Sequence, residues 1–351
     1  MRRGFFAGAL AVATALAITT SATGPVAAET LPTAGAPTIT LDVGDDMAGG
    51  THRIQFERVF AGIADESTDV YLYAPVGWNV NGGAGVVGLD PNKDPRAGDA
   101  FTPCGGDLAA YQLTQTKIDA LGTELASHVV PKDEAHYGEI GSAGQSGEDL
   151  VTLLYNVFDE AFYDCATDQY TAGYFAPGFI DQYQMNVIVI DANDFVNMTG
   201  NPTTATDLTN EGVIAHELEH LIHNYTDKGE ISWVDEGLAD FAIFLNGYPV
   251  GGSHLTYHQV FHRETSLTRW GGGLENYGAA FSFFQYVWEQ AGGNGDGTFD
   301  PDQSLNSCCT VGRSVVPGEA LYVAMAFATP VMPSAGSSKI VLMNKSPARS
   351  L

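Results

Sequence analysis

The sequence is poor in positive charge, in charge of either sign and in cysteine. Its 351 residues include 15 Lys and Arg against 42 Asp and Glu, and only 16% of the chain is charged. Such an acidic chain repels nucleic acids and anionic membranes, so we expect neither as a partner. The apolar fraction of 44% still suffices for a buried core. Disordered chains are rich in charge and poor in aromatic residues, so the composition is unlike that of a disordered chain.

Long hydrophobic runs are missing after the first thirty residues. Arg2 and Arg3 precede an apolar run from Phe5 to Ile18, and the small side chains of Val26-Ala27-Ala28 suit signal peptidase. A run of about 14 residues is short for a membrane anchor, so residues 1–28 are predicted to be a signal peptide. No later run approaches about 18 apolar residues, the length a membrane helix needs. We therefore expect a soluble, monomeric protein that is secreted and extracellular.

The four cysteines fit an oxidising compartment. Cys104 and Cys165 lie in the well-patterned part of the chain, and we expect them to form a disulfide bond. Cys308 and Cys309 are adjacent, which disfavours a bridge between them.

Hydrophobic patterning predicts the main elements of secondary structure. Alternating and β-branched segments predict strands at Thr38–Val43, Arg53–Phe60, Asp69–Tyr73, Leu150–Tyr155 and Met185–Asp191. Helical spacing predicts a helix from Leu113 to Val129 that Pro131 closes, and further helices near Glu211–Asn224 (with Asn210 as N-cap), Val234–Leu245 and Tyr277–Gln290.

We divide the remaining chain into three parts. Residues 29–109 are β-rich and are interpreted as a propeptide or an accessory segment, and residues 110–304 hold the motifs described below. Residues 305–351 contain four Lys and Arg and one acid, although the rest of the mature chain is strongly acidic. This tail is either a small separate β-structured segment or a disturbed C-terminus, for instance from a frameshift.

The segment His216-Glu217-Leu218-Glu219-His220 carries the strongest chemical signal. On a helix, a spacing of four residues places both imidazoles on one face, one turn apart, as zinc requires. Glu217 adjoins the first histidine and can reach a metal-bound water. This is the H-E-x-x-H arrangement, in which the Glu is the general base.

A third protein ligand can be sought in two patterns. The metzincin pattern fails, because His223 stands where that pattern requires Gly and Thr226 where it requires His. The segment Ser232 to Asp240 instead resembles the second helix of the gluzincin superfamily, which implies Glu236 as the third ligand. The same resemblance, to thermolysin-like enzymes, implies that Asp235 and Asp240 hydrogen-bond the ligand histidines; ordinary helix-start charge is the alternative.

The resemblance extends over about residues 110 to 300. Further segments are similar to the hyicolysin-type neutral zinc metalloproteases of bacteria: Gly147 to Leu150, Tyr155 to Asp159, Ala172 to Pro177, Val187 to Asp191, Ala215 to His223 and Glu236 to Ala242. It implies an α+β, zincin-like fold with a mixed sheet over an active-site helix and a mostly helical C-terminal subdomain. It also implies Tyr277, at the start of a downstream helix, as the group that stabilises the oxyanion.

Two further groups of residues contain potential metal ligands but have simpler interpretations. His254, His258 and His262 would form a stripe on a helix, for which we favour a solvated face over a second metal site. Residues 294–302 resemble part of a calcium loop but lack the terminal bidentate Glu, so an acidic turn is favoured over a Ca²⁺ site.

These observations predict a secreted zinc-dependent endopeptidase that binds Zn²⁺ and cleaves a peptide or protein substrate with a metal-activated water. An exported zinc-binding adhesion or binding module without turnover is one alternative, and a zinc hydrolase of non-peptide amides is another. The presence of Glu217 argues against the binding module, because such a module needs no base beside its metal.

Overall fold

The computed structural model describes residues 31–76, 113–164, 167, 169–200, 208–250, 252–293 and 338–343. The expected signal peptide, the four cysteines with the expected Cys104–Cys165 pair, and the loop 294–302 lie outside these ranges. No helix within them is long and apolar enough to span a membrane.

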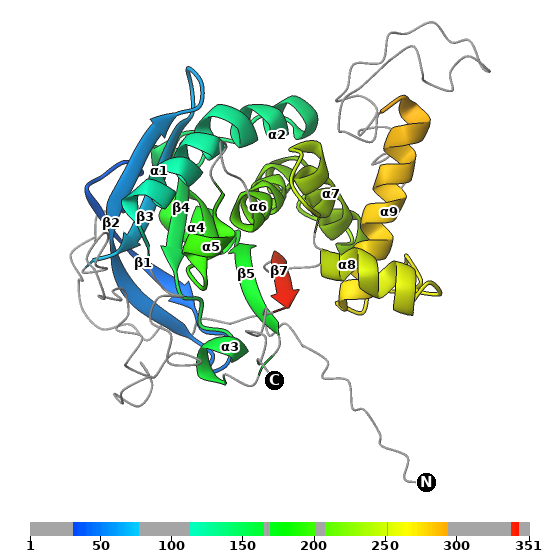
Figure 1. The fold of residues 1–351 in the computed structure, drawn as a ribbon. Helices are drawn as coiled ribbons and strands as arrows, with labels where there is room; N and C mark the ends of the chain where they lie inside the picture. Colours follow the sequence, from blue (N-terminus) through cyan, green and yellow to red (C-terminus); the bar gives the residue numbers. More distant parts are fainter. Residues whose placement is uncertain are drawn as a thin grey trace, which may run out of the picture.

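One mixed sheet of seven strands lies on one side of the described structure, and helices cover one of its faces (Figure 1). The strand order is β1-β2-β3-β4-β6-β5-β7; β3, β4 and β6 are parallel, and the other pairs are antiparallel. The strands are β1 (Thr38–Gly44), β2 (Thr51–Ile63), β3 (Asp69–Pro75), β4 (Leu150–Tyr155), β5 (Gln169–Phe175), β6 (Asn186–Asp191) and β7 (Ser338–Met343).

Most of the helices form a second layer that extends away from the sheet (Figure 1). They are α1 (Gln115–Glu124), a π-helix (Leu125–Val129), α2 (Val130–Tyr137), α6 (Thr209–Thr226), α7 (Ser232–Leu245), α8 (Gly252–Thr256), a second π-helix (Tyr257–Phe261) and α9 (Leu274–Ala291). The remaining helical segments are a 3₁₀ turn (Gly144–Ser146), α3 (Glu160–Tyr163), α4 (Gly178–Tyr183) and α5 (Phe195–Met198). The α+β class expected from the sequence is confirmed.

The central strands of the sheet are completely buried. Every residue of β4 and of β6 is buried, and their β-branched and leucine side chains suit strands covered on both faces. Helix α6 packs on β5 and β6 with one side and on α7 with another. The active-site helix expected from the sequence therefore lies between the sheet and the outer helices.

The N-terminal strands belong to the same sheet as the strands that support α6. Strand β3 pairs in parallel with β4, with Val70 opposite Leu150. The expected boundary near residue 110 therefore separates strands that pair within one sheet. At the other edge, β7 from the atypical tail pairs antiparallel with β5 and extends this sheet.

Two details of the predicted helices were wrong. Pro131 does not close its helix: π-type bonding, in which the Val130 N–H reaches Leu125 O, ends the α-type ladder first. Pro131 then falls in the first turn of α2, where a missing N–H is tolerated. Asn210 is not an N-cap, because α6 begins one residue earlier and Asn210 Nδ2 donates to Thr199 Oγ1 at 3.0 Å.

Candidate metal centre

Helix α6 buries an unusual number of polar side chains. His216, Glu217 and Glu219 are fully buried, and His220 is 2% exposed. Burying ionisable groups is unfavourable unless they are paired or bind a metal. The polar face of α6 is thus a candidate site rather than a solvated surface.

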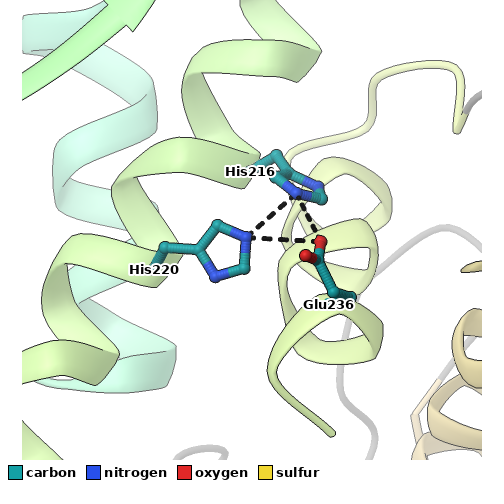
Figure 2. A group of neighbouring side chains, drawn as sticks. All are labelled: His216, His220 and Glu236. Carbon is teal, nitrogen blue, oxygen red and sulfur yellow. Dashed lines mark hydrogen bonds and ion pairs between the residues drawn. The ribbon is translucent and has the colours of Figure 1, made fainter. Parts of the chain in front are cut away.

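His216 and His220 converge with a third buried side chain, Glu236 of α7, as Figure 2 shows. The Nε2 atoms of His216 and His220 lie 3.1 Å apart. Glu236 Oε2, from α7, lies 3.3 Å from His216 Nε2 and 3.5 Å from His220 Nε2. Tetrahedral zinc with bonds of 2.0–2.1 Å would hold its ligand atoms about 3.4 Å apart. The three expected ligands therefore form a group of buried side chains that could hold a metal ion.

The far nitrogens of the two histidines face carboxylates, as the resemblance implied. His216 Nδ1 lies 3.1 Å from Asp240 Oδ1, and His220 Nδ1 lies 3.2 Å from Asp235 Oδ1. Such pairs fix the ring orientation and leave Nε2 for a metal. Both carboxylates come from α7, so the packing of α7 on α6 assembles the ligands and their partners together.

The carboxylates dominate the electrostatics of the pair of histidines. Burial alone would lower the pKa of His216, but hydrogen bonds to Asp240 and Glu236 raise it to about 9. The pKa of His220 is likewise lowered by burial but raised well above its usual value overall, chiefly by Asp235. The carboxylates therefore favour positive charge at this centre.

The predicted base, Glu217, lies at a close approach of strand β5 to α6. A Cβ added to Gly173 would lie 3.3 Å from Glu217 Cγ, 2.5 Å from Val213 Cγ1 and 2.7 Å from the Val189 carbonyl oxygen. Only a glycine lets the strand approach this closely. Glu217 is thus held against the strand, on the helix that carries both histidines.

The structure also brings Tyr277, on α9, to this centre. Its ring stacks on His254, with ring centroids 4.8 Å apart, and is only 5% exposed. Burial, and then the charges of Glu236, Asp240 and Glu217, raise the pKa of its hydroxyl well above the usual value. Tyr277 therefore remains a neutral donor beside the three carboxylates.

His254 corrects the expectation of a solvated histidine face. It is fully buried, and its Nδ1 lies 2.8 Å from Asp240 Oδ2. Burial would raise the pKa of Asp240, but the nearby His254 and His216 hold it below its usual range. The stripe is interrupted because the second π-helix begins at Tyr257, and His262 lies beyond it with its side chain 47% exposed. No group of potential metal ligands among the described residues includes any of the three histidines.

Two buried residues of this region were not assigned a role from the sequence. Glu219 lies 3.4 Å from His223 Nδ1, and His223 lies 3.5 Å from Asp235 Oδ1. Burial lowers the pKa of His223, but Glu219 and then Asp235 raise it to about 9. The signal was present in the spacing, since residues 216, 219, 220 and 223 share one helical face.

Comparison of the sequence with protein-family models and with curated proteins found no match. The interpretation of the centre therefore rests on its own residues and on the motifs described above.

Proposed function

We propose that this protein is a secreted zinc metalloendopeptidase with a zincin-like fold, of the gluzincin type. The observation that carries the proposal is the convergence of His216, His220 and Glu236 next to the buried Glu217. Two imidazoles and one carboxylate are the donor set of catalytic zinc sites in which a water completes the coordination. The natural substrate would be a peptide or protein, and we propose a monomeric, extracellular enzyme.

In this proposal, each residue of the centre has a defined task. Zinc held there would supply a water of lowered pKa and would polarise the scissile carbonyl. Glu217 accepts the proton of the attacking water and returns it to the leaving amine. The Tyr277 hydroxyl donates a hydrogen bond to the oxyanion of the tetrahedral intermediate. Asp235 and Asp240 hold His220 and His216 in the tautomer that leaves Nε2 free.

Hydrolysis of casein or of a peptide library by the purified secreted protein tests the proposal. Glu217→Gln is the matched control, because it keeps the shape of the side chain and removes the base. We expect hydrolysis by the wild type, its loss with a chelator, its return with zinc, and at least about 100-fold less in the variant. Equal hydrolysis by both proteins would refute the mechanism.

Two further outcomes would replace the proposed function. Zinc binding by both proteins with no hydrolysis by either would favour an exported binding module. Cleavage of small non-peptide amides, with no peptide cleavage, would favour a different zinc hydrolase. His216→Ala, which removes a ligand, serves as the control for specific zinc binding in all these measurements.

A further inference from the structure

A closed ring of four side chains lies on the side of His220 that faces away from Glu236. It alternates imidazoles and carboxylates: His220, Asp235, His223 and Glu219. His220 Nδ1 lies 3.2 Å from Asp235 Oδ1, and the same Asp235 oxygen lies 3.5 Å from His223 Nδ1. His223 Nδ1 lies 3.4 Å from Glu219 Oε1, and Glu219 Oε2 lies 3.8 Å from His220 Nδ1, which closes the ring.

Most of this ring is buried, unlike an ion pair at the protein surface. Glu219 is fully buried and His223 is 4% exposed. Among the described residues, neither Glu219 oxygen has a hydrogen-bond partner, so the two histidines are what compensates its charge. Asp235 has a side chain 25% exposed and could turn toward solvent if nothing opposed it. Asp235 Oδ1 is hydrogen-bonded to His220 Nδ1 and also lies within ion-pair distance of His223 Nδ1, which has no hydrogen-bond partner among the described residues. Attraction between the carboxylate and the His223 ring restrains that movement.

We propose that His223 is a positioning residue for the metal centre: with Glu219 as its counter-charge, it holds the Asp235 carboxylate against Nδ1 of the ligand His220. This inference rests on the proposed zinc site. The positions of these residues on two helices support this role, because His220 and His223 lie on α6 whereas Asp235 lies on α7, next to Glu236. A side chain that ties Asp235 to α6 therefore also keeps both ligand-bearing helices in register.

The ring predicts a specific pattern of zinc affinities. Loss of a group that directly orients a ligand reduces metal affinity by about 10–100-fold. His223 acts through Asp235, so His223→Leu should weaken zinc binding by about 3- to 10-fold, less than Asp235→Asn. His223→Asn places an amide N–H near the Nδ1 position and should restore most of the loss. His136→Leu, a part-buried histidine outside the ring, is the matched control and should bind zinc as the wild type does.

The experiment measures the zinc dissociation constant by competition with a chromophoric chelator, together with the visible absorption spectrum of the Co²⁺-loaded protein. A double variant, His223→Leu with Asp235→Asn, separates positioning from general stability. If His223 acts through Asp235, the double variant binds zinc within about twofold of Asp235→Asn alone, because coupled residues are not additive. The Co²⁺ band should shift in His223→Leu and not in the control.

Three results would each overturn the inference. The first is a zinc affinity and Co²⁺ spectrum that do not change in His223→Leu, and the second is additive losses of zinc affinity in the double variant. The third is the binding of two zinc ions by the wild type, one of which is lost in Glu219→Gln. The last would mean that the ring is a second cation site. If His223→Leu does not fold, the near-isosteric Glu219→Gln tests the same ring and should also weaken zinc binding. Absence of zinc binding by the wild type would instead refute the proposed function, which keeps the two failures distinct.

Discussion

Oδ2 of Asp240 lies 2.8 Å from Nδ1 of His254, and both side chains are fully buried. The other oxygen of the same carboxylate faces the proposed ligand His216 at 3.1 Å. Asp240 is thus held at its second oxygen by a residue of α8. Because a carboxylate fixed at both oxygens cannot rotate away, His216 is presented with its Nε2 toward Glu236.

Asp240→Asn should weaken zinc binding by about 10–100-fold, because an amide cannot accept hydrogen bonds from both imidazoles. It should also lower the free energy of unfolding of the metal-free protein, since it leaves a buried histidine poorly paired. Calorimetry with zinc and denaturant unfolding measure the two effects. Asp181→Asn, at an exposed position on α4, is the control. Zinc affinity within twofold of the wild type would contradict the assigned role.

Tyr277→Phe should lower kcat by about 10²–10³-fold with little change in zinc affinity. The phenyl ring keeps the stacking on His254, so only the hydroxyl is lost. Steady-state kinetics on a peptide substrate separate kcat from KM. A rise in KM with kcat unchanged would indicate that Tyr277 contributes to substrate binding rather than to the oxyanion.

The sequence predicted what depends on local spacing. His216, Glu217 and His220 lie on one helix, so their arrangement follows from its period, and the strands at 150–155 and 186–191 follow from their apolar runs. Glu236 lies on a different helix, and only the resemblance pointed to it. The environment of His254 could not be predicted, because its burial results from the packing of α8 on α9.

The two errors at Pro131 and Asn210 have different physical origins. Proline usually ends a helix, but a π-turn before Pro131 changed the bonding at that point. Asparagine is a common N-cap, but Asn210 has a tertiary partner in Thr199. In both cases a contact or a bonding pattern outside the usual local rule decided the structure.

Gly173→Ala should destabilise the protein by about 1–3 kcal/mol, because the added methyl group overlaps Val213 and the Val189 backbone. The carbonyl oxygen at 2.7 Å belongs to the central sheet and cannot move aside easily. Gly178→Ala is a matched control, since nothing lies within 4 Å of its added Cβ. Urea unfolding of the three proteins measures the effect, and equal stability of the two variants would show that β5 can retreat from α6.

Glu211→Gln should stabilise the protein at pH 8 and have little effect at pH 5. Glu211 is 2% exposed in the first turn of α6, and its Oε1 accepts a hydrogen bond from the Gly200 N–H at 2.8 Å. Burial raises its pKa from 4.5 to about 7. Between these values the unfolded chain releases the proton while the folded chain keeps it, so stability falls as the pH rises through this window.

The decrease in the free energy of unfolding that Glu211 causes is complete above about pH 7 and amounts to about 3 kcal/mol at most. An amide at position 211 cannot ionise and can still accept from Gly200, so the variant should lack this part of the pH dependence. Denaturant unfolding from pH 5 to 8 measures the difference between the two proteins, in which all other titrating groups cancel. Glu264→Gln, at a side chain 81% exposed, should show no such difference. A constant difference between wild type and Glu211→Gln across this range would mean that Glu211 ionises in the folded protein as readily as in the unfolded chain.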